Sequence, residues 1–198
     1  MKIYDVSQEL LSSATYPGDP VPQLTVLSSM DQGDIYNLTS FSACSHNGTH
    51  VDAPRHFIKD GKTVGEMDLE RLVGYAYVAS ASGQIDGEDA KEILKKAASH
   101  SNEAAKRILI KGDATVTLDA AEAFYLGGVS LIGSETQSVG PIEAPMAVHK
   151  LLLKNDVALL EGLRLASVHD GVYFLSAAPI NVGIAEGAPC RALLIDFE

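Results

Sequence analysis

Alternation of hydrophobic and polar residues, together with short apolar stretches, predicts the β-strands of this chain. Residues 35–41 alternate most regularly, and as a strand they would lead the chain directly into a cluster of histidines. A dense turn signal, Tyr16-Pro17-Gly18-Asp19-Pro20, precedes this region. Shorter apolar stretches predict further strands at residues 2–6, 24–27, 75–79, 107–111, 129–132, 157–160, 172–175 and 192–197.

Helix signals alternate with the strands in the second half of the chain. Asp86 is a predicted N-cap, followed by acidic residues in the first turn and by two lysines near the far end, an order that suits the helix dipole. Residues 118–126 form a predicted helix that a glycine pair ends. Pro145 begins another helix, which runs to about residue 155. This mixture predicts a single α/β domain over residues 1–198, with helices flanking a mixed sheet or partial barrel.

Composition narrows the class of protein. The 198 residues suffice for one sizeable core, and a hydrophobic fraction of 46% indicates a folded globular protein. The net charge of -11 disfavours nucleic acid and anionic membranes as partners. No apolar run is long enough to cross a bilayer, and the first residues lack the apolar run of a signal peptide. Cys44 and Cys190 form no disulfide framework, so we expect reduced thiols in a cytoplasmic protein.

The strongest functional signal is a cluster of three histidines and an aspartate within residues 46–56. Its members are His46, His50, Asp52 and His56. On an extended backbone His50 and Asp52 point the same way, and Asn47-Gly48 allows a tight turn that returns His46 toward them. Pro54 holds the preceding residue extended and so helps to aim His56. Imidazole and carboxylate ligands together suit zinc and similar divalent ions, so the cluster predicts a metal site.

Two residues farther along the chain are candidate ligands only when they are considered together with this cluster. His149 lies on the predicted helix at 145–155 and has apolar neighbours one helical turn away, so its side chain should face the interior. Glu161 follows the apolar strand at 157–160. Taken alone, His149 would be a core histidine, and Glu161 would be a surface acid at a strand end.

The histidine cluster resembles the H-x-G-T-H-x-D-x-P-x-H signature of the bacterial cyclase family, which includes kynurenine formamidases and isatin hydrolases. The resemblance covers nearly the whole chain. Supporting segments are Tyr16-Pro17-Gly18-Asp19, Ile132-Gly133-Ser134-Glu135-Thr136, Leu160-Glu161-Gly162-Leu163 and Gly187-Ala188-Pro189-Cys190-Arg191-Ala192. The resemblance implies the family's swivelling β/β/α fold and assembly into a homodimer or higher homo-oligomer.

The resemblance also implies a set of metal ligands. His46, His50 and Asp52 would bind one divalent ion. Asp52, His149 and Glu161 would bind or bridge a second. Family members differ in using zinc or manganese and in holding one ion or two, so we expect zinc first and manganese as the alternative.

Catalytic and substrate-binding roles follow from the same resemblance. His56 would be the acid/base beside the metal. Tyr16 occupies the position where the kynurenine branch typically carries a Trp that stacks on the substrate's ring. Glu135 stands where the family often has Asp, which adds one methylene, and Thr136 follows it. We therefore expect Tyr16, Glu135 and Thr136 to bind the substrate.

These residues predict hydrolysis of a C–N bond in a small molecule: an amide, a formamide, or a cyclic imide or lactam. A metal lowers the pKa of bound water from about 15.7 to about 7, and His56 could pass the proton on to the leaving nitrogen. A cyclase or dehydratase, a lyase, could use the same groups and is the alternative enzyme. A metal-dependent binding protein without turnover is the third possibility, and the presence of His56 argues against it.

Overall fold

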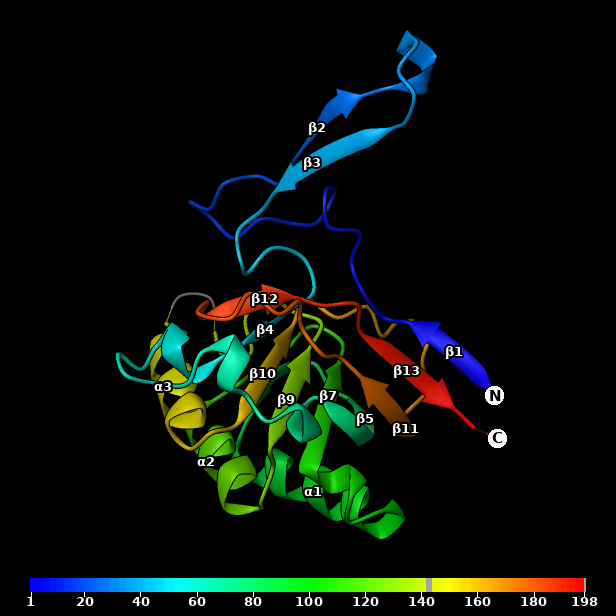
Figure 1. The fold of residues 1–198 in the computed structure, drawn as a ribbon. Helices are drawn as coiled ribbons and strands as arrows, with labels where there is room; N and C mark the ends of the chain where they lie inside the picture. Colours follow the sequence, from blue (N-terminus) through cyan, green and yellow to red (C-terminus); the bar gives the residue numbers. More distant parts are fainter. Residues whose placement is uncertain (142–143, 198) are drawn as a thin grey trace.

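A curled, nine-stranded mixed sheet forms the centre of the protein in this computed structural model, which describes residues 1–141 and 144–197 (Figure 1). The strand order is β1-β13-β11-β5-β7-β9-β10-β4-β12. The strands are β1 Lys2–Asp5, β4 His50–Asp52, β5 Val73–Ser80, β7 Arg107–Lys111, β9 Leu131–Ser134, β10 Ala158–Glu161, β11 Gly171–Ser176, β12 Gly187–Pro189 and β13 Leu193–Asp196. The central strands β5, β7, β9 and β10 are parallel, whereas the flanking pairs are antiparallel.

Helices cover one face of this sheet. They are α1 Gly87–His100, α2 Leu118–Leu126 and α3 Met146–Lys154. In β7, Ile108 and Ile110 pack with the helices, whereas Leu109 packs in a second core on the opposite face. Because both faces of the central strands are buried, these strands appear in the sequence as continuous apolar runs.

Smaller elements complete the fold. β2 Gln23–Ser28 and β3 Leu38–Ser42 form a separate hairpin that extends away from the sheet (Figure 1). β6 Gly83–Ile85 and β8 Ala114–Val116 form a short parallel pair. Short 3-10 helices span Met30–Gln32, Pro54–His56, Val64–Glu66, Leu69–Arg71 and Ala104–Lys106. Within the described residues, no helix combines the length and apolar character needed to cross a bilayer.

The structure confirms the predicted mixed α/β fold, and local signals account for its helices. Asp86 caps α1 by accepting hydrogen bonds from two backbone amides of the first turn. Strand β3 begins at Leu38 and not at residue 35, because the Asn37 side chain accepts a hydrogen bond from the Met30 amide (2.8 Å) and closes the loop. Strand β9 begins at Leu131 and not at residue 129, because the Val129 amide bonds to the carbonyl of Phe124 at the end of α2.

Candidate metal centre

Strand β4 presents two of the predicted ligands on one face of the sheet. His50 and Asp52 flank Val51, whose side chain is buried in the core cluster on the opposite face. The antiparallel register of β4 and β10 sets His50 opposite Glu161. Directly opposite residues of an antiparallel pair share a face, so the register brings Glu161 to the same side. Strand pairing therefore joins ligands that lie far apart in the sequence.

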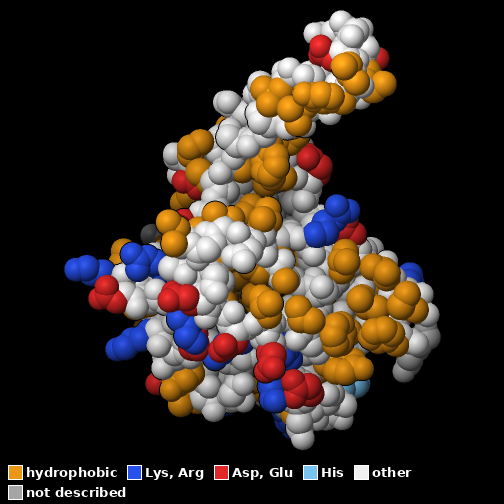
Figure 2. Space-filling model, viewed as in Figure 1, with side chains coloured by type: hydrophobic (Ala, Val, Ile, Leu, Met, Phe, Trp, Pro, Cys, Tyr) orange, Lys and Arg blue, Asp and Glu red, His pale blue; other side chains and the backbone are white. Residues whose placement is uncertain are grey.

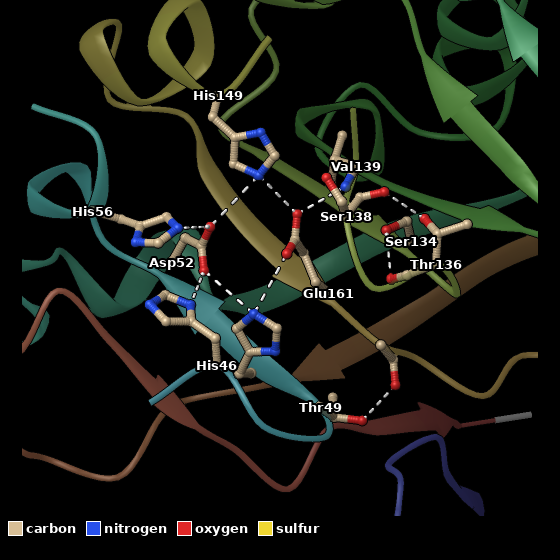
Figure 3. A network of polar contacts seen from close by, with 12 residues as sticks. His46, Thr49, Asp52, His56, Ser134, Thr136, Ser138, Val139, His149 and Glu161 are labelled. Carbon is tan, nitrogen blue, oxygen red and sulfur yellow. Dashed lines mark hydrogen bonds and ion pairs between the residues drawn. The ribbon is translucent and has the colours of Figure 1, made fainter. Parts of the chain in front are cut away.

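A tight turn returns His46 to this face. Gly48 at the turn has a φ of 65°, which glycine adopts without strain. The Thr49 hydroxyl donates a hydrogen bond to the Gly162 carbonyl (2.7 Å) and thereby anchors the turn to the loop after β10. His46 Nδ1 lies 2.8 Å from Asp52 Oδ1 (Figure 3). The turn predicted from Asn47-Gly48 thus aims His46 at the aspartate.

Two histidines are oriented by backbone carbonyls. His149, in the first turn of α3, directs Nδ1 to the Pro145 carbonyl (2.9 Å) and Nε2 to Glu161 Oε1 (3.1 Å). His50 directs Nδ1 to the Gly48 carbonyl (3.0 Å) and Nε2 to Glu161 Oε2 (3.4 Å). A carbonyl can only accept, so each Nδ1 carries a proton, and each Nε2 is directed at the carboxylates. This is the usual arrangement of histidines that bind a metal.

The donor atoms form two overlapping groups that fit divalent cations. One group is His46, His50 and Asp52, and the other is Asp52, His149 and Glu161; within each group the donor atoms lie within 4.8 Å of one another. Asp52 Oδ2 is buried and has no hydrogen-bond partner among the described residues. Leaving a buried carboxylate oxygen unpaired is costly, and a cation would satisfy it. Nitrogen and oxygen donors of this kind suit zinc, with Asp52 common to both groups.

The electrostatics of the group favour a positive charge at its centre. Burial lowers the pKa of His50, but hydrogen bonds and charges from Asp52 and Glu161 outweigh it and raise that pKa to about 10. Burial raises the pKa of Asp52, yet hydrogen bonds from His46 and His50 bring it well below its ordinary value. For Glu161, burial and the nearby Asp52 charge also raise the pKa, but His149 and His50 lower it more. Both buried carboxylates are therefore ionised at neutral pH.

His56 lies beside the ligands without joining either group. It ends the short helix Pro54–His56, and its Nε2 is 3.9 Å from Asp52 Oδ2. Its ring centroid is 4.0 Å from that of His46. Burial is the main reason that the pKa of His56 falls below its ordinary value. The ring is therefore neutral near pH 7 and able to accept a proton.

A cavity of about 280 Å³ opens onto these groups. It is lined by Tyr16, Asp19, His46, Gly48, His50, His56, Phe57, Gln137, Ser138, Pro145, His149 and Glu161. Its size suits a small molecule with a single ring. Tyr16, which the resemblance predicts to bind the substrate, thus lines the cavity beside the donor groups.

The structure does not bring Glu135 and Thr136 to this cavity. The Glu135 carboxylate accepts hydrogen bonds from the backbone amides of Gly112 (2.7 Å) and Leu165 (2.6 Å). Glu135 and Thr136 line a separate cavity. The next two residues, Gln137 and Ser138, line the metal cavity in their place. Glu135 and Thr136 thus adjoin the residues that line the metal cavity, and the hydrogen bonds of Glu135 turn its carboxylate away from that cavity.

Glu186 is a polar neighbour of the centre that sequence reasoning missed. Its carboxylate accepts a hydrogen bond from the Ser45 hydroxyl (2.5 Å) and lies 3.4 Å from His46 Nε2. Glu186 therefore lies beside His46 on the side opposite Asp52. Its position directly before Gly187, the first residue of the closing motif, was the available signal.

Comparisons with known proteins point in the same direction as the geometry. Residues 4–141 match a family model described as "Putative cyclase". A kynurenine formamidase of Erythrobacter litoralis is 33% identical over 98% of this chain and 93% of its own. A kynurenine formamidase of Salinibacter ruber is 32% identical over 99% of this chain and 98% of its own.

Solved structures share the fold. A potential metal-dependent hydrolase with cyclase activity superposes with a TM-score of 0.81 at 26% identity, covering 100% of this chain and 98% of its own. Isatin hydrolase A of Labrenzia aggregata superposes with a TM-score of 0.81 at 21% identity, covering 100% of this chain and 94% of its own. At that lower identity the likeness concerns the fold alone.

Proposed function

Because this chain belongs to the cyclase family, we propose that it is a metal-dependent hydrolase that cleaves the C–N bond of an aryl formamide. One observation carries the proposal. Three histidines and two buried carboxylates converge beside a small cavity, and a neutral histidine lies next to them. The names of the relatives, kynurenine formamidases, support N-formylkynurenine as the first substrate to test.

The proposed ligands follow the two donor groups. His46, His50 and Asp52 hold one divalent ion, and Asp52, His149 and Glu161 hold a second where two are bound. Zinc is the proposed ion, and manganese is the alternative. When bound, the ion supplies Lewis acidity, which makes water more acidic and polarises a carbonyl oxygen.

The protein's own residues move the proton and orient the substrate. His56 takes a proton from water as the water oxygen adds to the formyl carbon, and returns it to the amine nitrogen as the C–N bond breaks. The products are formate and the free amine. The Ser138 hydroxyl lines the cavity, is buried and has no hydrogen-bond partner among the described residues, so it is available to a polar group of the substrate. Tyr16 and Phe57 provide aromatic surface for the ring.

We extend the proposal to the chain as a whole. Residues 1–198 act as one domain on a small molecule, and the protein works in the cytoplasm. Two free thiols, Cys44 and Cys190, support a reducing compartment.

A substrate panel tests the proposed activity. We expect protein loaded with zinc or manganese to release formate from N-formylkynurenine and simple formanilides, and to lose that activity when a chelator removes the metal. Cyclic imides and lactams, assayed in parallel, test the other C–N bonds. Turnover of the cyclic substrates alone would show that the enzyme cleaves cyclic C–N bonds and not formamides. No turnover of any substrate with either metal would contradict the hydrolase proposal.

Substitutions of Tyr16 test the cavity wall. Stacking on an aromatic ring contributes about 0.5–1.5 kcal/mol beyond area burial. We therefore expect Tyr16→Ala to raise KM by about 2- to 10-fold with a smaller change in kcat. Tyr16→Trp should preserve or improve hydrolysis of N-formylkynurenine, and Tyr16→Phe tests the hydroxyl. Tyr125→Ala, on α2 and outside the cavity, is the control. If all three Tyr16 variants had the KM of the wild-type protein, Tyr16 would not be part of the substrate site.

A further inference from the structure

Asp19 contributes a carboxylate to the metal cavity that belongs to neither donor group. It is the last residue of a tight turn, in which the Asp19 amide donates a hydrogen bond to the Tyr16 carbonyl (3.0 Å). Gly18 has a φ of 99°, a positive value that a type II turn with Pro17 before it requires at this position. The backbone therefore forms the turn, and the Asp19 side chain is not needed for it.

The Asp19 carboxylate has neither a hydrogen bond nor an ion pair with any residue that the structure describes. The residue is half-buried, so its charge is partly withdrawn from water. The sequence has no Lys or Arg between Lys2 and Arg55, and in Figure 2 the Lys and Arg side chains lie on the body of the protein, below the β2–β3 hairpin. A half-buried carboxylate is stabilised by a cation, and here that cation has to come from outside the chain.

The position of Asp19 relates its charge to the ring of a bound substrate. The first and fourth Cα atoms of a β-turn lie within about 7 Å, so Asp19 lies beside Tyr16, the proposed stacking residue. No Lys or Arg is among the described residues that line the cavity. A carboxylate on the substrate therefore meets no positive side chain there, whereas an ammonium group beside the ring meets Asp19.

We propose that Asp19 binds an ammonium group carried by the substrate's ring or its side chain, so that the preferred substrates are cationic aryl formamides. The inference rests on the proposed hydrolase function and names a substrate class within it. Ammonium and carboxylate form a charge-assisted hydrogen bond, which is stronger than a neutral one. N-formylkynurenine carries such an ammonium group. Its carboxylate finds no cation in the cavity wall, so its amine is the group that Asp19 selects.

Three formanilides of similar size separate charge from shape. They carry an aminomethyl, an ethyl or a carboxyl group, each tested at the meta and para ring positions. We expect the metal-loaded wild-type protein to have a kcat/KM for an aminomethyl compound about 10-fold or more above that for the ethyl compound, with the carboxyl compound lowest. Equal values, or a preference for the carboxyl compound, at both ring positions would overturn the proposal.

Substitutions of Asp19 test whether this carboxylate is the source of the preference. Asp19→Asn should lower the aminomethyl-to-ethyl ratio of kcat/KM by about 10-fold, and Asp19→Lys should favour the carboxyl compound over the aminomethyl compound. Asp31→Asn removes the charge of an exposed acid outside the cavity and should keep the wild-type ratio. If Asp19→Asn slowed all three compounds equally, Asp19 would have a structural role and the proposal would be wrong.

Direct binding tests the ammonium site without turnover. Benzylamine, a cation at neutral pH, and benzyl alcohol, which is neutral, carry the same ring. By calorimetry we expect the wild-type protein to bind benzylamine about 10-fold more tightly than benzyl alcohol, and Asp19→Asn to bind the two equally. High salt should weaken the binding of benzylamine more than that of benzyl alcohol.

The binding result also separates this inference from the proposed function. Equal binding of the two compounds by the wild-type protein, or a preference for benzylamine that persists in Asp19→Asn, would contradict the Asp19 site. A protein that binds benzylamine through Asp19 but hydrolyses no formamide would support the ammonium site and contradict the proposed hydrolase function.

Discussion

The Asp52→Asn variant should lose both its metal and its activity, the largest effect that we expect from any single substitution. Asp52 belongs to both donor groups, contacts His46 and His50 through Oδ1, and presents Oδ2 to His149. Asparagine keeps the shape but removes the charge. Loss of an outer partner of a metal ligand already costs about 10–100-fold in affinity or activity, so loss of this ligand should cost more than about 100-fold. Elemental analysis of purified protein, with turnover of the preferred substrate, measures both effects.

Two comparisons sharpen the Asp52 experiment. Asp60→Asn changes an exposed acid of the following loop that lies outside both donor groups, and should leave metal content and turnover unchanged. His46→Ala should lose less metal than Asp52→Ala if Asp52 bridges two ions, whereas equal losses would indicate one ion. Full metal content and full turnover in Asp52→Asn would refute the assigned centre.

The second large effect should separate chemistry from metal binding. We expect His56→Ala to keep its metal while kcat falls by about 10²–10⁴-fold, the usual contribution of a general acid/base. The reason is geometric, because His56 lies outside both donor groups, with its Nε2 3.9 Å from the nearest oxygen of Asp52. Metal content and kcat are measured on the same preparation. His169→Ala removes an exposed histidine outside the cavity and serves as the control. If the His56→Ala variant lost its metal, His56 would be a metal ligand and the assigned role would be wrong.

The sequence predicted those parts of the candidate site whose geometry depends on local structure. The period of two along a strand predicted that His50 and Asp52 share a face, and helix periodicity predicted that His149 is buried. Side-chain capping and glycine signals likewise predicted where α1 begins and α2 ends. In each case the controlling contacts lie within a few residues of the position concerned.

Prediction was weaker where distant contacts decide. Strand β4 has only three residues, too few to show a strand pattern in the sequence. Its position is fixed by pairing with β10 and β12. The side of the loop that Glu135 faces depends on amides of Gly112 and Leu165, which the sequence does not place nearby. An alternating pattern likewise predicted strand β3, but could not show that it pairs with β2 in a hairpin separate from the main sheet.

The position of β4 between β10 and β12 has a consequence for how the protein folds during synthesis. Its anchoring residue Thr49 contacts Gly162, 113 positions later, and its outer neighbour β12 is made later still. Contacts of such long range form after local ones, because the entropy of closing the intervening loop must be overcome first. During synthesis, β4 therefore waits as an unpaired segment while the parallel strands and their helices assemble. The complete set of donor residues includes His149 and Glu161, so it can be assembled only after most of the chain has been made.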